Sequence, residues 1–128
     1  MAFLLDTNVA IDLRDGVEVV LAKVEALGGA IFLSIVSRVE LEGGVVRDPA
    51  QAALRGSRLN ALLAGLAVLP FDDACADAYR DIIEAAGYSR RKLLDRMIAA
   101  QALVHRAILV TRNGDDFRDV PGLALLEW

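Results

Sequence analysis

Four acidic positions, far apart in the sequence, carry the side chains that could act together in a chemical reaction. They are Asp6, Glu40, Asp95 and one of the adjacent pair Asp115 and Asp116. Carboxylates that gather in a fold repel one another, so a cluster is reasonable mainly when a divalent cation occupies it. Ligands that are all oxygen select magnesium or manganese. Such an ion generates hydroxide from water and orients a phosphodiester, so the chemistry expected is metal-assisted phosphodiester hydrolysis.

Two predicted strands would bring some of these acids to one edge of a sheet. Asp6 ends the apolar run Phe3–Leu5, which predicts a buried strand. The clearest strand signal, Ile108–Thr111, is followed by the polar loop that holds the acidic pair. Ligands of open parallel sheets bind just beyond the carboxyl ends of the strands. If these two strands are neighbours, Asp6 and the loop share that crevice, and Glu40 and Asp95 must reach it from separate helices.

The remaining elements alternate in the same way. Further short strands are predicted at Ala30–Leu33, Ala67–Leu69 and Leu123–Leu126. Helix starts are predicted near Asp15, Ser34–Ser37, Asp48–Pro49, Asp72–Asp73 and Ser89, and the segment from Asn8 to Leu13 is expected to be an apolar turn. This alternation indicates an α/β domain with a mainly parallel sheet of about five short strands, covered on both faces. No repeat or linker is seen, so residues 1–128 are expected to form a single domain.

Composition excludes several classes of protein. The chain has 128 residues, 55% hydrophobic and 25% charged, which is enough for a well-filled core. Its apolar runs fall far short of the roughly 18 residues that a membrane span requires. No signal peptide is seen. Cys75 is the only cysteine, so a disulfide scaffold and a thiolate zinc site are both excluded within one chain, and a cytoplasmic location is expected.

Charge is distributed unevenly. The net charge of −4 argues against a general electrostatic binder of nucleic acids. Residues 88–118 nevertheless carry seven basic side chains against three acidic ones. A phosphate-bearing ligand is compatible with this excess, and a solvated surface balanced by acids elsewhere explains the charge equally well. The basic residues are Arg90, Arg91, Lys92, Arg96, Arg106, Arg112 and Arg118.

Each acidic residue also has a purely structural explanation. Asp6 could cap the turn after its strand, and Ser37-x-x-Glu40 is itself a capping-box pattern. Asp95 could pair with Arg91 or Arg96 on a helix surface, although a small apolar face follows it. The acidic pair could consist of ordinary loop residues. Spacing alone therefore does not decide between a site and four local roles.

Four short segments, in order along the chain, carry a family resemblance. They are Leu4–Val9, Ser34–Leu41 with Gly43, Asp95–Ala102, and Leu109–Phe117 followed by Val120–Leu123 and Trp128. These segments resemble the motifs of PIN domains, and within that family those of the VapC-like toxins of bacterial and archaeal toxin–antitoxin pairs. The match covers essentially the whole chain.

The resemblance implies a three-layer α/β/α domain and an endoribonuclease that depends on Mg²⁺ or Mn²⁺. It also implies a cognate VapB-like antitoxin, an RNA substrate and a homodimer. Carried over by motif, the catalytic acids are Asp6, Glu40, Asp95 and Asp116. Of these, Asp6, Asp95 and Asp116 would bind the metal, and Glu40 would position water or support a second metal. Thr7, Asn8 and Asn113 would form the polar surroundings. Candidate contacts with RNA phosphates are Arg90, Arg91, Lys92, Arg96 and Arg112.

Competing interpretations fit the sequence less well. A signalling receiver domain needs an acidic pair after its first strand, where this chain has Thr7 and Asn8. Phosphatases of the haloacid-dehalogenase type need an aspartate at the position of Asn8. His105 is the only histidine, which excludes within one chain a ribonuclease mechanism that uses two. A catalytically silent PIN module, kept for dimerisation or partner binding, stays open as the alternative.

Overall fold

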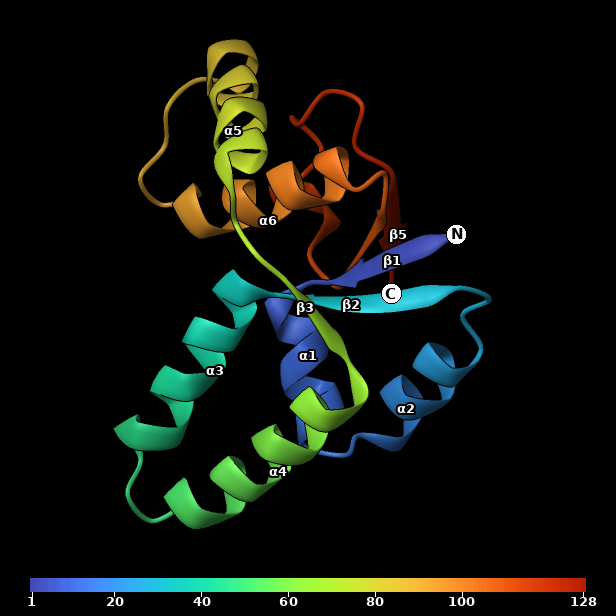
Figure 1. Ribbon diagram of the computed structural model, residues 1–128, viewed down its shortest axis with the longest axis vertical. Helices are drawn as coiled ribbons and strands as arrows, with labels where there is room; N and C mark the ends of the chain where they lie inside the picture. The colour runs from blue at the N-terminus through green and yellow to red at the C-terminus, as the bar shows by residue number, and fades with distance from the viewer.

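The computed structural model describes residues 1–128 as strands and helices that alternate along the chain (Figure 1). The strands are β1 (Ala2–Leu5), β2 (Ala30–Ser34), β3 (Ala67–Leu69), β4 (Ile108–Thr111) and β5 (Leu125–Glu127). The helices are α1 (Thr7–Arg14), α2 (Glu18–Glu25), α3 (Ile35–Arg47), α4 (Ala52–Gly65), α5 (Asp73–Ala86) and α6 (Leu93–Val104), with a 3₁₀ turn at Gly114–Asp116.

The sheet places β1 at its centre and β4 beside it. Its strand order is β3-β2-β1-β4-β5 and every pairing is parallel. The register sets Leu5 against Val110, and the N–H of Asp6 donates to the carbonyl of Val110 at 2.8 Å. Asp6 and the loop after β4 therefore leave the sheet at the same edge, as the sequence predicted.

Alternate side chains of the central strands face two separate layers of helices. Leu4 and Leu109 belong to the core beneath α5 and α6. Phe3, Leu5 and Val110 point the other way, into a core shared with α1 and α2. This alternation follows from the two-residue period of a strand. Figure 1 shows α5 and α6 on one side of the sheet and α1, α2 and α4 on the other, which confirms the three-layer α/β/α architecture.

Several predicted boundaries were wrong. Residues after Asn8 form the helix α1 and not a turn, and β5 begins two residues later and ends one residue later than predicted. The helix α3 continues through Gly43 and Gly44 to Arg47, so Asp48-Pro49 makes a turn and not a helix start. Gly44 is buried, and its carbonyl accepts a hydrogen bond from Arg55 Nη1 at 2.9 Å. Packing against α4 thus outweighs the roughly 1 kcal/mol cost of glycine in a helix.

Two predicted helix starts also shift. The helix α2 begins at Glu18 after Val17, without a side-chain cap from Asp15. The helix α6 begins at Leu93, and Ser89 Oγ instead accepts from the N–H of Lys92 at 3.3 Å in the preceding turn. None of the helices combines the length and the apolar character needed to span a bilayer.

Candidate active site at the carboxyl edge of the sheet

One cavity collects all four predicted acids. Its volume is about 270 Å³, and its lining contains a single hydrophobic residue, Ile11. The lining comes from the end of β1 and the start of α1, from α3, from the first turn of α6, and from the loop after β4. The other lining residues are Asp6, Thr7, Asn8, Glu40, Asp95, Asn113 and Asp116. The structure thus brings together every acid and every surrounding polar residue that the sequence pointed to.

Asp6 is the most enclosed of the acids, with only 4% of its surface exposed. One carboxylate oxygen accepts from the N–H of Thr7 at 2.8 Å, and the other accepts from Thr111 Oγ1 at 2.7 Å. Burial raises the pKa of Asp6, the two hydrogen bonds lower it in part, and the charge of Asp116 raises it again. Asp6 does cap α1, as its structural explanation proposed. The same side chain still lines the cavity, so capping and a role in the site are compatible.

Asp95 lies in the first turn of α6, and its environment favours the protonated form. Burial first, and then the charges of the three other acids, raise the pKa of Asp95 to about 6. Lys92 lowers the pKa only in part. Pairing with Arg91 or Arg96 is not seen, because Arg96 bonds to Asp119 instead. The charges of Asp6, Asp116 and Glu40 therefore all act on Asp95.

Glu40 is held by a short chain of hydroxyl groups. Thr7 Oγ1 donates to Glu40 Oε1 at 2.9 Å and lies 2.8 Å from Ser37 Oγ. The cap of α3 is Ser34, whose hydroxyl accepts from the N–H of Val36 at 2.9 Å. The capping-box explanation of Ser37 and Glu40 is therefore wrong. Ser37 lies inside the helix and faces the site.

The two adjacent acids of the loop after β4 have different positions. Asp116 lines the cavity. The side chain of Asp115 is 94% exposed and pairs with Arg118. The 3₁₀ turn at Gly114–Asp116 separates the two directions, so the structure places Asp116, and not its neighbour, among the four acids.

Two hydroxyl residues that support the acids were missed as site residues. Thr111 is the last residue of β4 and is fully buried. Ser37 is fully buried and precedes Glu40 by three residues, which places both on one face of a helix. The signal that could have found them was their position: Ser37 lies one helical turn before Glu40, and Thr111 ends the strand that was expected beside the strand of Asp6.

The predicted basic contacts fall into three groups. Arg90 and Arg91 are exposed. Lys92 and Arg112 are each paired, with Asp119 at 3.4 Å and Asp12 at 3.1 Å. Arg96 differs from them: it is 2% exposed, and its guanidinium donates to the Gly87 carbonyl and to Asp119. A buried and paired guanidinium is not available to a phosphate, so Arg96 is left out of the proposed RNA contacts.

The donors around the cavity suit a hard divalent cation. They are carboxylate, amide and hydroxyl oxygens, the type that magnesium and manganese prefer. The buried Oδ1 of Asn8 has no hydrogen-bond partner, so one more oxygen is unsatisfied at this wall. No three acidic, histidine or cysteine side chains form a compact group around one point. Magnesium tolerates this, because it keeps several waters and takes one or two carboxylates directly.

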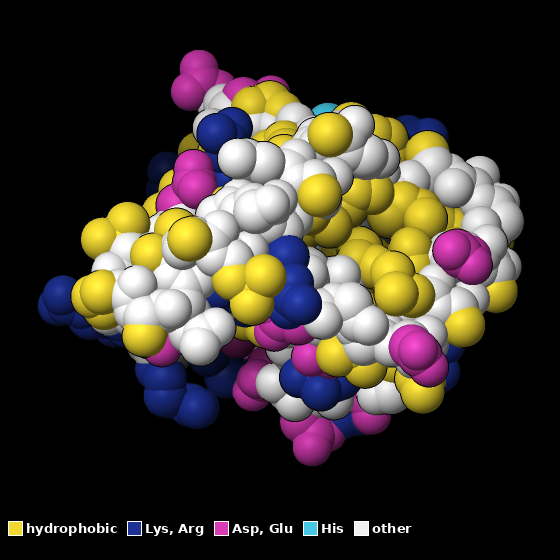
Figure 2. All heavy atoms as spheres, turned by 90° about the horizontal axis from the view of Figure 1, so that it is seen from below, with side chains coloured by type: hydrophobic (Ala, Val, Ile, Leu, Met, Phe, Trp, Pro, Cys, Tyr) yellow, Lys and Arg dark blue, Asp and Glu magenta, His cyan; other side chains and the backbone are white.

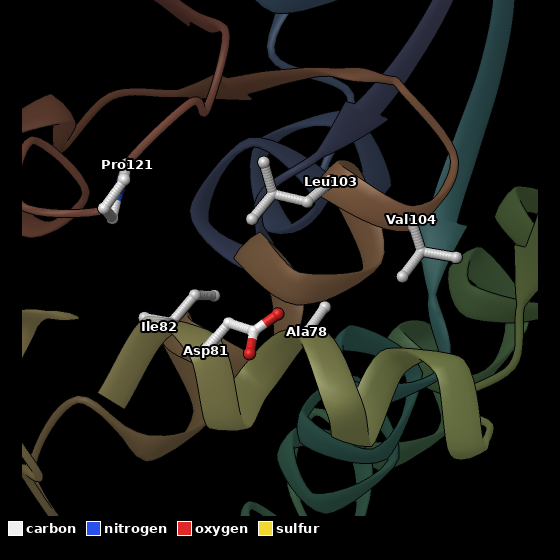
Figure 3. Close-up of a pocket in the computed structure, with 6 residues that line it drawn as sticks. All are labelled: Ala78, Asp81, Ile82, Leu103, Val104 and Pro121. Atoms are coloured by element: carbon white, nitrogen blue, oxygen red, sulfur yellow. The ribbon is translucent and has the colours of Figure 1, made fainter. Parts of the chain in front are cut away.

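The other hollows of the surface offer no comparable chemistry. Figure 3 shows one of about 300 Å³ between α5, α6 and the loop at Pro121, where the carboxylate of Asp81 lies among apolar side chains. Four of its six lining residues are hydrophobic. Asp81 is the only polar residue of that lining and is itself exposed, whereas seven polar residues line the carboxyl-edge cavity, which is therefore the candidate active site.

Comparisons with known proteins identify the family of the chain. A family model described as "PIN domain" matches residues 3–123. Ribonuclease VapC2 of Rickettsia felis is 27% identical, over all of this chain and 98% of that protein. The VapBC2 structure from Rickettsia felis, bound to a DNA fragment from its promoter, has a TM-score of 0.88 at 26% identity and covers 100% of this chain and 99% of that chain. FitAcB from Neisseria gonorrhoeae has a TM-score of 0.78 at 28% identity and covers 98% and 96%.

Proposed function

The chain belongs to the PIN-domain family, and from that premise we propose that it is a metal-dependent endoribonuclease, the toxin of a toxin–antitoxin pair. The observation that carries the proposal is the gathering of Asp6, Glu40, Asp95 and Asp116 in one polar cavity. Four like charges with raised pKa values at two of them are costly unless a cation neutralises them. The name of the Rickettsia felis relative supports RNA as the substrate.

The position of each residue in the cavity determines its proposed role. Asp6, Asp95 and Asp116 would hold Mg²⁺ or Mn²⁺, which when bound supplies the activation of water and the neutralisation of charge on the phosphate. Thr111 and the N–H of Thr7 hold the carboxylate of Asp6 in one orientation. Thr7 fixes Oε1 of Glu40, which leaves Oε2 free to accept a proton from the attacking water. Asn8 and Asn113 complete the polar wall.

Basic side chains that bind the rest of the substrate must lie outside the cavity, because its lining contains no lysine or arginine. Arg90, Arg91, Lys92 and Arg112 carry positive charge on the segments that lead into the cavity wall. Arg112 precedes Asn113 of that wall, and its side chain is 49% exposed although it pairs with Asp12. We assign these four side chains to RNA phosphates, which such contacts position without reading sequence.

A VapB-like antitoxin is the proposed partner. The related structures include VapBC and other toxin–antitoxin complexes, as their descriptions state. Figure 2 shows hydrophobic side chains gathered in a hollow over α2 and α4, on the face at the bottom of Figure 1. This hollow has a volume of about 510 Å³ and is the largest of the four. Its apolar lining includes Leu13, Leu21, Leu62 and Leu66, which suits an apolar segment of a small partner chain.

A homodimer acting in the cytoplasm completes the proposal. Val39 on α3, Val46 on α3 and Leu54 on α4 are 66%, 77% and 49% exposed. Exposed apolar side chains on adjacent helices are suited to a second copy of the chain. Light scattering at micromolar concentration tests the dimer, and a monomer would contradict it.

The alternative function is a catalytically silent PIN module that serves dimerisation or partner binding. The observation in its favour is that the acids form no compact group of three, beside a large apolar hollow suited to a partner. Cleavage assays separate the two functions directly.

The test uses purified protein, total bacterial RNA and Mn²⁺. The parent is expected to cleave, whereas Asp6→Asn and Asp95→Asn fold normally and leave the RNA intact. Asp115→Asn is the matched control, because it removes the same charge at a side chain that lies outside the cavity. Cleavage by both site variants at the parent's rate would overturn the assignment. Equal loss in the control would show that net charge, and not the cavity, is responsible.

A further inference from the structure

The loop between α5 and α6 carries the only aromatic side chain among the large exposed hydrophobic residues. Tyr88 is 71% exposed and packs in none of the hydrophobic clusters. Ser89, Arg90, Arg91 and Lys92 follow it, so the segment 88–92 contains three basic residues and no acid. We call residues 88–92 the aromatic–basic loop.

The aromatic–basic loop is fastened at both ends. Gly87 at φ 89° turns the chain out of α5, and its carbonyl accepts from the buried guanidinium of Arg96. Arg96 also binds Asp119 Oδ2 at 2.9 Å, and Lys92 Nζ lies 3.4 Å from the same oxygen. Tyr88 is therefore exposed on a loop that is held at both ends. Because the loop is already ordered, binding costs it little conformational entropy.

This loop leads directly into the candidate active site. Lys92 precedes the first residue of α6, and Asp95 lies in the first turn of that helix. Figure 1 shows the connection running from the far end of α5 down to the beginning of α6. The Lys92 end of the loop adjoins α6, whereas Tyr88 follows the C-cap of α5, so an RNA strand that reaches Asp95 meets the ring by extending along the loop.

Aromatic faces interleaved with basic side chains are the usual means of binding single-stranded nucleic acids. Every base has a π-face that can stack, and nearby cations attract the backbone. The lining of the cavity has four acids and no basic side chain, so side chains that contact the rest of the strand lie on a neighbouring surface. A protein partner is less suited, because the loop has three positive charges around one ring and no further exposed apolar side chain within residues 88–92.

We propose that Tyr88 stacks on an unpaired base of the RNA substrate outside the cavity, while Arg90 and Arg91 contact the adjoining phosphates. This inference rests on the proposed ribonuclease function and adds a base contact made by a side chain outside the cavity. Stacking tolerates any base, so the loop contributes affinity for unpaired RNA and not a sequence preference.

The test measures binding of fluorescein-labelled mixed-sequence RNA 12-mers by anisotropy, with Ca²⁺ in place of Mn²⁺. Tyr88→Ala is expected to weaken binding of the single strand by roughly 5- to 100-fold, in line with measured stacking contributions. Tyr88→Phe keeps the ring and should bind like the parent. Val19→Ala, on exposed α2 away from the loop, is the control. A blunt-ended 12-mer duplex hides its base faces, so Tyr88→Ala should bind it as the parent does.

Other results would overturn the proposal in distinguishable ways. If Tyr88→Ala binds the single strand as tightly as the parent, stacking is excluded and the ribonuclease function is unaffected. If Tyr88→Ala instead loses dimerisation in light scattering, the ring belongs to a protein interface. If the folded parent binds neither RNA, both the stacking and the proposed function fail.

Discussion

The hydroxyl of Thr111 donates to Asp6 Oδ2 at 2.7 Å, and this bond joins the ends of two neighbouring strands at the cavity. Thr111 is fully buried, so no water can replace it as a donor. The bond both orients the carboxylate of Asp6 and holds down its pKa.

Replacing Thr111 with valine keeps the shape of the side chain and removes the donor. We expect cleavage to fall by roughly 10- to 100-fold, the usual effect of losing a group that orients a metal ligand. The Mn²⁺ concentration for half-maximal activity should rise with it. Thr111→Ser keeps the hydroxyl and should cleave like the parent. Full activity in the valine variant would show that Asp6 needs no orientation from β4.

Stability of the metal-free protein should depend on pH through Asp95. Its pKa is raised to about 6 in the fold from an ordinary 3.8, mainly by burial and by the other acids. The folded state therefore binds the Asp95 proton more tightly than the unfolded state does. The contribution of this proton to the free energy of unfolding is fully present below pH 4 and is lost as the pH rises through 6. Melting temperatures in EDTA should fall from pH 5 to pH 7.5.

Asp95→Asn should remove most of that dependence. Because it also removes repulsion, the variant is expected to melt at or above the parent's temperature at pH 7.5 without metal. A large drop in melting temperature would instead support a structural role for Asp95 in its helix.

A divalent cation should stabilise the parent and not the site variants. Ligands that bind only the folded state raise its melting temperature by mass action. We expect Mn²⁺ to raise the melting temperature of the parent and of Asp115→Asn at pH 7.5. Asp6→Asn and Asp95→Asn should show little change. Equal shifts in all four proteins would place the bound ion elsewhere.

Replacing Arg96 should lower the stability of the fold, whereas replacing its exposed neighbours should not. Its hydrogen bonds to Gly87 and Asp119 are charged and buried, so Arg96→Met should cost on the order of 1–3 kcal/mol of unfolding free energy. Arg90→Ala should leave stability unchanged, because its side chain is exposed. Urea denaturation measures both. Equal stabilities would mean that Arg96 is not a structural residue.

Sequence predicted the sheet edge and the four acids because those features depend on local patterns. The apolar runs before Asp6 and Arg112 define buried strands, and parallel pairing then fixes where their ends meet. The structure adds that Asp116, and not Asp115, faces the cavity, which depends on a 3₁₀ turn that no residue pattern marks.

Other features depended on contacts between distant segments. Gly43 and Gly44 stay helical because α3 packs on α4, which a local rule for glycine cannot include. Arg96 was expected among surface cations, yet Asp119, 23 residues away, holds it inside. The cap of α3 fell to Ser34 because β2 ends there, which frees Ser37 to reach Thr7.

The central claim is that the cavity at the carboxyl edge cleaves RNA. It is tested most directly by expressing the chain and its Asp95→Asn variant under tight control in a bacterial host and mapping new RNA ends by sequencing. We predict growth arrest with discrete new RNA ends for the parent only, and the positions of those ends would identify the target RNA. New ends of the same position and abundance with Asp95→Asn would contradict it.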